Sequence, residues 1–122
     1  MKKILIVEDE LAYLKLLNDQ LTKVGYQIIE AKNGKDGLRT AEKEQPDVIL
    51  LDIRMPVMNG MEMLGELRKS TYGKNAKVII LTNLEPNDEI LRSVLEDQPT
   101  YYFMKSDTEL SDLVSKIKKL LA

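Results

Sequence analysis

Val48-Ile49-Leu50-Leu51-Asp52 sets four consecutive apolar residues directly before a carboxylate. An apolar run of strand length without polar alternation is typical of a parallel strand that is buried on both faces. The sequence therefore predicts a central strand over residues 48–51, with Asp52 where that strand ends. Taken alone, an aspartate at such a place is better interpreted as a loop carboxylate that caps a local turn. Its role depends on what the other strands bring beside it.

Four more apolar runs of strand length are rich in β-branched or aromatic residues, and longer stretches with helical spacing separate them. The clearest helical stretch is the last one, in which apolar side chains fall on one stripe of a helix. The five predicted strands cover residues 4–7, 26–31, 48–51, 78–81 and 101–104, and the last stripe is Leu110, Leu113, Val114, Ile117, Leu120 and Leu121.

Local signals predict where some of the helices begin and end. Gly25 is placed to end the first helix, because glycine adopts the left-handed conformation that closes a helix. Asn87 or Asp88 is placed to cap the start of the fourth helix. Ser106 and Glu109 have the spacing of a capping box in front of the last helix.

A strand and a helix therefore alternate five times. This alternation predicts an α/β fold in which helices cover both faces of a parallel sheet, because each crossover between parallel strands needs a helix. We expect a (βα)5 doubly wound, five-stranded parallel sheet in the flavodoxin-like order 2-1-3-4-5. The 122 residues fit one domain, and no linker or internal repeat divides them.

Composition excludes several kinds of chemistry. The chain has no cysteine and no histidine, which excludes disulfides, thiol catalysis and the usual transition-metal ligands. The net charge of −2, from 18 basic and 20 acidic residues, argues against a nucleic-acid or membrane-surface protein. No apolar run approaches a membrane span or a signal peptide, so the expected location is the cytoplasm.

The ligand site of an open parallel sheet lies outside the carboxyl ends of its strands. Glu8 and Asp9 follow the first predicted strand, Thr82 follows the fourth and Lys105 follows the fifth. Together with Asp52, the two acidic residues form a set of oxygen ligands that suits Mg²⁺. A carboxylate can also act as a nucleophile and form an acyl phosphate, for which a cation and a lysine supply the charge neutralisation.

Each of these residues also has a purely structural interpretation. Glu8 and Asp9 suit the first turn of a helix, whose dipole favours acidic side chains. A lysine at a strand end is usually solvated, and a threonine in a strand usually reflects β propensity. Four separate strand ends that carry compatible chemistry favour the functional interpretation.

These residues resemble the receiver domain of bacterial two-component response regulators. The resemblance covers essentially the whole chain, and its most specific part has the form D-x-x-M-P-x-x-x-G. The matching segments are Ile4-Leu5-Ile6-Val7-Glu8-Asp9-Glu10, Leu50-Leu51-Asp52-Ile53-Arg54-Met55-Pro56-Val57-Met58-Asn59-Gly60, Ile79-Ile80-Leu81-Thr82 and Tyr102-Phe103-Met104-Lys105.

The resemblance implies a metal site. Asp9 and Asp52 would bind Mg²⁺ directly, Glu8 would act largely through a water molecule, and the backbone carbonyl of Arg54 would complete the protein's share of the ligands. Such a domain catalyses only its own aspartyl phosphorylation and dephosphorylation, so we do not expect a conventional enzyme.

The resemblance also implies the acceptor and the switch. Asp52 would take a phosphoryl group from a phosphohistidine of a partner kinase, or from a small donor such as acetyl phosphate. Thr82 and Lys105 would contact the phosphoryl oxygens. Thr82 and Tyr102 would form the switch pair, in which the hydroxyl moves toward the phosphate and the aromatic ring turns inward.

The implied partners are a sensor histidine kinase or phosphotransfer protein and a downstream protein. The downstream protein would bind the face built from the fourth helix, the fifth strand and the fifth helix. The resemblance is also compatible with a phosphorylation-dependent homodimer, and no direct contact with nucleic acid is expected. No output domain follows Ala122 in this sequence, so residues 1–122 are interpreted as one receiver domain.

The sequence departs from the family in three places. Asn83 stands where a small residue usually follows the threonine, and Ser106 replaces the usual proline after the lysine. Because a cis bond before a residue other than proline costs roughly 2.5–4 kcal/mol, we expect a trans Lys105-Ser106 bond and a shifted final loop. Gln98-Pro99 replaces a common Gly-Ala, and Pro99 is expected to end the fourth helix.

Three alternatives stay open. A phosphatase of the haloacid-dehalogenase type needs a second aspartate two positions after the nucleophile, where this chain has Arg54, and it usually has a cap domain. A degenerate receiver would act only as a protein-interaction scaffold. A nucleotide-binding domain is disfavoured, because neither G-x-G-x-x-G nor G-x-x-x-x-G-K-[ST] occurs.

Overall fold

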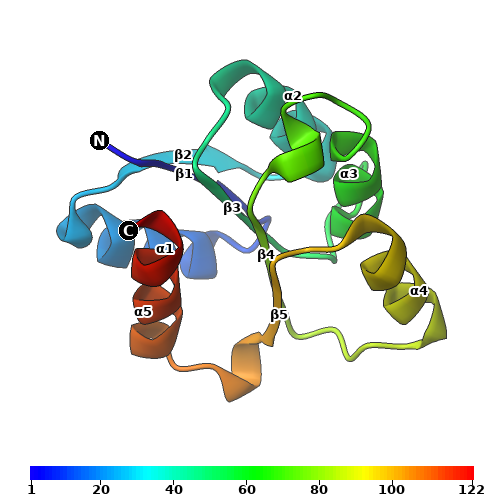
Figure 1. The fold of residues 1–122 in the computed structure, drawn as a ribbon. Helices are drawn as coiled ribbons and strands as arrows, with labels where there is room; N and C mark the ends of the chain where they lie inside the picture. Colours follow the sequence, from blue (N-terminus) through cyan, green and yellow to red (C-terminus); the bar gives the residue numbers. More distant parts are fainter.

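A computed structural model describes all residues from 1 to 122, and in it strands and helices alternate along the whole chain (Figure 1). The strands are β1 (Lys3–Val7), β2 (Gln27–Ala31), β3 (Val48–Leu51), β4 (Val78–Thr82) and β5 (Tyr101–Met104). The α-helices are α1 (Leu11–Val24), α2 (Gly34–Glu44), α3 (Gly60–Leu67), α4 (Asp88–Asp97) and α5 (Leu110–Leu121). Two 3₁₀ helices, η1 (Gly73–Asn75) and η2 (Lys105–Asp107), lie in the connections.

The five strands form one parallel sheet in the order β2-β1-β3-β4-β5, as the sequence predicts. The central strand β3 pairs with β1 on one side and with β4 on the other. Leu51 lies opposite Val7 of β1 and Ile80 of β4. In this register β1 and β3 end level with each other and β4 extends two residues further, so the carboxyl ends of the three middle strands meet at one edge of the sheet.

Two apolar layers cover the sheet, with α1 and α5 on one face and α2, α3 and α4 on the other (Figure 1). The side chains of β3 alternate between these layers. Ile49 and Leu51 belong to the layer under α2 and α3, whereas Val48 and Leu50 belong to the layer under α1 and α5. Because both faces of β3 are covered, all four of its residues are apolar and fully buried.

The predicted end of α1 and the predicted start of α4 are confirmed, whereas the predicted start of α5 is wrong. Gly25 ends α1 with a φ of 108°, and the side chain of Asn87 accepts a hydrogen bond from the N–H of Ile90 at the start of α4. Ser106 does not cap the last helix. Residues 105–107 wind into η2 instead, and α5 begins only after Glu109, without a side-chain cap. The N–H of Ser106 is bonded elsewhere, to the side chain of Asn83.

The end of α4 agrees with the prediction that no helix continues into Pro99. The helix ends at Asp97, and Gln98 adopts a left-handed conformation with a φ of 45°. Its backbone N–H donates to the carbonyl of Val94 and closes the last turn. A residue other than glycine at such a φ is uncommon and needs support from its surroundings.

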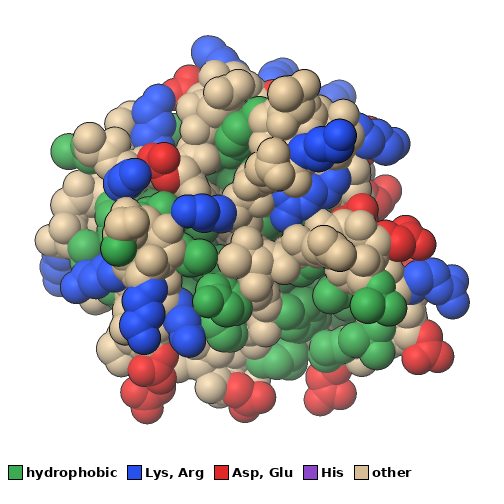
Figure 2. Space-filling model, viewed as in Figure 1, with side chains coloured by type: hydrophobic (Ala, Val, Ile, Leu, Met, Phe, Trp, Pro, Cys, Tyr) green, Lys and Arg blue, Asp and Glu red, His purple; other side chains and the backbone are tan.

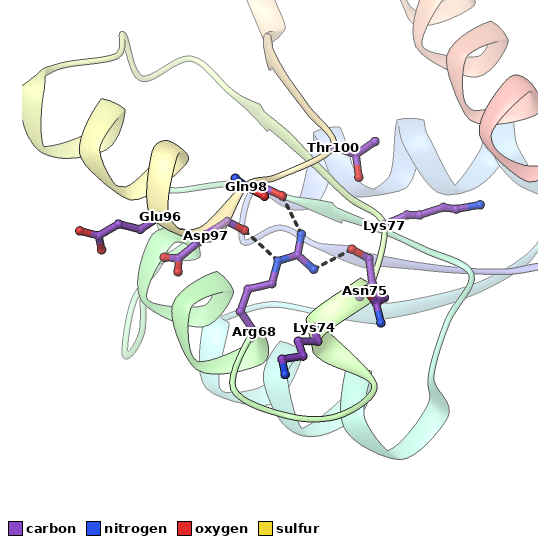
Figure 3. Close-up of a pocket in the computed structure, with 9 residues that line it drawn as sticks. Arg68, Lys74, Asn75, Lys77, Glu96, Asp97, Gln98 and Thr100 are labelled. Atoms are coloured by element: carbon purple, nitrogen blue, oxygen red, sulfur yellow. Dashed lines mark hydrogen bonds between the residues drawn. The ribbon is translucent and has the colours of Figure 1, made fainter.

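Arg68 supplies part of that support. Its guanidinium reaches from the end of α3 to four backbone carbonyls, as Figure 3 shows in part. Burial lowers the pKa of Arg68, and the carboxylate of Asp97 opposes that shift. The guanidinium therefore ties the end of α4 to the connection between α3 and β4. The four acceptors are the carbonyls of Gly73, Ala76, Asp97 and Gln98, at 2.7 to 2.9 Å.

Candidate functional site

The buried polar residues of this protein lie at one place. Among the buried residues, the polar or charged ones are Glu8, Asp52 and Thr82, and each is at most 7% exposed. They stand at the carboxyl ends of β1, β3 and β4. Burying a carboxylate or a hydroxyl costs free energy unless the group has a partner. Their collection at one edge of an otherwise apolar core therefore marks the candidate site.

Glu8, Asp9 and Asp52 form the acidic part of this site. One carboxylate oxygen from each lies within 4.8 Å of the others. Glu8 and Asp52 are buried, whereas Asp9 is exposed to solvent. Three convergent carboxylates without histidine or cysteine form a donor set that fits a hard divalent cation such as Mg²⁺.

Lys105 lies against the two buried carboxylates. Its Nζ is 2.5 Å from Oε1 of Glu8 and 3.4 Å from Oδ2 of Asp52, and its side chain is 9% exposed. Lys105 is the first residue after β5, as the sequence predicts. The ammonium of Lys105 thus lies between the carboxylate that follows β1 and the predicted acceptor that follows β3.

Burial and neighbouring charges change the acidity of this pair. Burial raises the pKa of Glu8 to about 7; the hydrogen bond from Lys105 opposes this shift, and the charge of Asp52 adds to it. For Lys105, burial lowers the pKa, but the hydrogen bond with Glu8 and the charge of Asp52 outweigh that effect and raise it. The lysine therefore stays charged, and Glu8 is the group that gains or loses a proton near neutral pH.

Asp52 is held by its own backbone surroundings. Its Oδ1 accepts a hydrogen bond of 2.8 Å from the N–H of Ile53, which leaves Oδ2 toward Lys105. Gly60, the first residue of α3, packs against the backbone of this segment. A Cβ on Gly60 would overlap the carbonyl oxygen of Asp52, which explains the glycine at this position in the motif.

Thr82 and Tyr102 both form hydrogen bonds with the backbone of Leu84. The Oγ1 of Thr82 accepts a hydrogen bond of 3.2 Å from the N–H of Leu84, and the hydroxyl of Tyr102 donates to the carbonyl of Leu84 at 2.8 Å. The ring of Tyr102 is partly buried against the layer under α2 and α3. Burial raises the pKa of this tyrosine, and the charge of Asp52 adds to the shift.

The two family departures at positions 83 and 106 contact each other. The Oδ1 of Asn83 accepts a hydrogen bond of 3.0 Å from the N–H of Ser106. The structure contains no cis peptide bond, so the Lys105-Ser106 bond is trans, as the sequence predicts. A proline at position 106 would have no N–H to donate, so this contact depends on both departures.

Arg54 lies in the loop between β3 and α3, two residues after Asp52, and its side chain is exposed. No backbone hydrogen bond uses its carbonyl oxygen. The same loop contains Val57 at a φ of 70°, with a hydrogen bond of 2.8 Å from the N–H of Met58 to the carbonyl of Pro56. This is the rare form of γ-turn, which is strained for a β-branched residue.

The sequence reasoning missed Tyr13. Its ring lies on α1, and the Nζ of Lys105 is 4.3 Å from the ring centre. The available signal was its place in the first turn of the helix that follows Glu8 and Asp9. That place alone does not identify which side chain the ring would meet.

A surface pocket of about 400 Å³ lies elsewhere, at the opposite ends of β4 and β5 (Figure 3). Arg68 lines it, but the guanidinium already donates to backbone carbonyls. This pocket holds none of the predicted site residues, and the acidic cluster remains the place where reactive groups converge.

Comparison with known proteins agrees with this geometry. Residues 4–118 match the family model described as the response regulator receiver domain. The chain is 37% identical over 116 residues to sporulation initiation phosphotransferase F of Bacillus subtilis, covering 94% of this chain and 92% of that protein.

Solved structures show the same fold. A CheY-like receiver domain protein from Methanospirillum hungatei is 33% identical, with a TM-score of 0.88 over 98% of this chain and 94% of that one. The response regulator TrrA from Thermotoga maritima, crystallised in complex with Mg²⁺-BeF, is 38% identical, with a TM-score of 0.85 over 98% and 99% of the two chains. The chain therefore belongs to the response regulator receiver domains of two-component signalling.

Proposed function

We propose that Asp52 is the phosphoryl acceptor of this receiver domain. One observation carries the proposal: Asp52 is a buried carboxylate at the end of the central strand, within reach of a largely buried lysine side chain and of two further carboxylates. No other aspartate of the chain is buried. A carboxylate in these surroundings has the charge neutralisation that phosphoryl transfer requires.

In the proposed reaction, an oxygen of Asp52 attacks the phosphorus atom of the donor. The bond between that phosphorus and the donor nitrogen or oxygen breaks, and the leaving group keeps the bonding electrons. Lys105 neutralises charge on the phosphoryl oxygens, and the hydroxyl of Thr82 donates a hydrogen bond to one of them. Both side chains flank the acceptor in the structure, since Thr82 ends the neighbouring strand and Lys105 contacts Asp52.

The acidic cluster is the proposed Mg²⁺ site. Asp9 and Asp52 would hold the ion directly, with Glu8 contributing largely through water and Arg54 through its backbone carbonyl. When bound, Mg²⁺ neutralises charge that develops on the phosphoryl oxygens. The donor set supports this choice, because oxygen ligands are the only ones that the site offers.

The proposed donor is the phosphohistidine of a sensor kinase or of a phosphotransfer protein, and acetyl phosphate would serve as a small substitute. Similarity to a sporulation phosphotransferase and to a response regulator crystallised with Mg²⁺-BeF supports this class of partner. The domain would then catalyse only its own phosphorylation and hydrolysis. Residues 1–122 would act as one receiver unit.

Phosphorylation would be transmitted to a partner through the face formed by α4, β5 and α5. Thr82 and Tyr102 both bond to Leu84, so a phosphoryl group that draws the threonine hydroxyl away would disturb the segment that precedes α4. Leu91 and Leu95 of α4 are 51% and 77% exposed, and hydrophobic side chains gather around this helix in Figure 2. A downstream protein or a second phosphorylated copy would cover them.

Intact-mass measurement tests the proposal. Incubation with acetyl phosphate and Mg²⁺ should add one phosphoryl group to the native protein, and a chelator should prevent the addition. Asp52→Asn should take up none, whereas Asp19→Asn on the exposed part of α1 should behave as the native chain does. A native protein that stays unmodified with several donors would contradict the proposal and favour a scaffold without phosphoryl transfer. Steady release of phosphate from phosphomonoesters would favour a phosphatase instead.

A further inference from the structure

The ammonium of Lys105 has three neighbours, and its proposed role in phosphoryl transfer involves only the two carboxylates among them. Its ammonium contacts Glu8 and Asp52, and it also lies over the ring face of Tyr13, 4.3 Å from the ring centre. The lysine side chain is almost entirely removed from solvent. An aromatic face attracts a cation, and the attraction is stronger where water is excluded.

The ring differs from the carboxylates in what it does when a divalent cation binds. Glu8 and Asp52 belong to the acidic cluster, so a bound cation would compete with Lys105 for their negative charge. The ring of Tyr13 is not an oxygen ligand of that cluster. Its attraction for the ammonium therefore persists when the carboxylates are engaged.

The location of Tyr13 separates this contact from ordinary core packing. The buried stripe of α1 consists of Leu14, Leu17 and Leu21. Tyr13 is only partly buried and packs at the edge of that layer. The contact with Lys105 uses the ring face, so it requires an aromatic ring at position 13 but no hydroxyl.

We propose that Tyr13 is a positioning residue for phosphoryl transfer, whose ring holds the ammonium of Lys105 beside Asp52. The lysine then meets the phosphoryl oxygens without a search among other rotamers. This proposal rests on the proposed role of Asp52 as the acceptor.

A double-mutant cycle tests it, with the rate of phosphorylation by acetyl phosphate and Mg²⁺ followed by intact mass. Tyr13→Leu removes the ring and should slow the reaction by about 5-fold to 20-fold, which corresponds to about 1–2 kcal/mol and lies between an exposed and a fully desolvated cation–π contact. Tyr13→Phe restores the ring and should rescue the rate to within about 2-fold of the native one. Each substitution is repeated with Lys105→Met, where Tyr13→Leu should have no further effect.

Two outcomes of the rate measurements would overturn the proposal. Tyr13→Leu could leave the rate of the native chain unchanged, or it could slow the native chain and the Lys105→Met chain by the same factor, which would show that packing alone is involved. Thermal unfolding of every variant provides the check on folding. A native chain that takes up no phosphoryl group would refute the acceptor role of Asp52 and this proposal with it.

An NMR measurement separates the contact from the chemistry. The ring current of Tyr13 should shift the ε-methylene protons of Lys105 upfield in the native chain and in Tyr13→Phe. The shift should vanish in Tyr13→Leu. If the three chains gave the same lysine shifts, the ring would not hold the ammonium in solution, whatever the rates.

Discussion

The backbone N–H of Ser106 donates a hydrogen bond of 3.0 Å to the side-chain oxygen of Asn83. The bond joins the residue that follows β4, directly after Thr82, to the 3₁₀ helix η2, which begins at Lys105. Both residues are exposed, so the bond contributes little to global stability. Its consequence is local, because it restrains the two loops that border Asp52.

Breaking this bond should speed hydrolysis of the acyl phosphate. Asn83→Ala removes the acceptor and Ser106→Pro removes the donor, and each should raise the hydrolysis rate by about 2-fold to 10-fold, as expected for a net hydrogen bond of about 0.5–1.5 kcal/mol. The loops then restrict water less at the acceptor. The decay of the phosphorylated mass after removal of the donor measures the rate.

The control for this prediction is Ser106→Ala, which keeps the backbone N–H and should decay as the native chain does. The double variant Asn83→Ala with Ser106→Pro should decay no faster than the faster single variant, because both changes remove the same bond. Additive effects of the two changes would refute a role for the bond.

Glu8 should make Mg²⁺ binding depend on pH. Burial raises the pKa of Glu8 to about 7 from 4.5, so a proton competes with the cation below neutral pH. The apparent Kd for Mg²⁺ should weaken about 10-fold between about pH 8 and about pH 6, as competition at one group with this pKa requires. A titration followed by calorimetry at both pH values measures it. Glu8→Gln should bind more weakly overall and lose this part of the pH dependence.

The same pKa predicts the stability of the metal-free chain. The folded-state pKa is raised, so the unfolded chain releases the Glu8 proton first, and the free energy of unfolding should fall as pH rises from about 4.5 to about 7. Urea denaturation of the native chain and of Glu8→Gln over this range measures the effect. A larger loss of stability in Glu8→Gln than in the native chain would contradict the raised pKa.

Val57 should be replaceable with a gain in stability. A β-branched residue at a φ of 70° is strained, whereas asparagine tolerates this conformation. Val57→Asn should raise the free energy of unfolding by about 1 kcal/mol, the lower part of the range for such strain. Val24→Asn provides the matched control, since Val24 lies near the end of α1 without a positive φ and should bring no gain. Equal effects at both positions would argue against strain in the loop.

Arg68 should contribute strongly to the free energy of unfolding, because it joins segments near the amino ends of β4 and β5. Arg68→Met removes hydrogen bonds to four backbone carbonyls and should lower the free energy of unfolding by about 2–4 kcal/mol. Lys69→Met, at an exposed neighbouring position, should change it by less than about 0.5 kcal/mol. Urea denaturation compares the two. A loss of stability below about 1 kcal/mol for Arg68→Met would contradict this prediction, because it would show that water satisfies the four carbonyls at little cost.

Much of the fold follows from residues whose neighbours lie close in sequence. The unbroken apolar run at Val48–Leu51 predicts a strand covered on both faces, and Gly25 predicts the end of α1; both are confirmed. The convergence of Glu8 and Asp52 also follows from topology, because parallel strands bring their carboxyl ends to one edge. These features depend on periodicity and on strand direction, which a sequence carries.

The features that the sequence did not predict depend on contacts between distant side chains. Ser106 has capping-box spacing with Glu109, yet its N–H bonds to Asn83, which lies 23 positions earlier, and the helix starts later. The ring of Tyr13 meets Lys105 from the other end of the chain. Neither contact has a periodicity, so only the assembled fold reveals it.

The measurement that most directly tests the acceptor role locates the phosphoryl group on the chain. Hydride reduction of the protein after treatment with acetyl phosphate and Mg²⁺ converts a phosphorylated aspartate into homoserine, which tandem mass spectrometry of the peptides assigns to one position. We expect homoserine at position 52 and nowhere else. Homoserine at position 9, a reduced glutamate at position 8, or no reduced residue in a protein that had gained phosphoryl mass would contradict the role of Asp52.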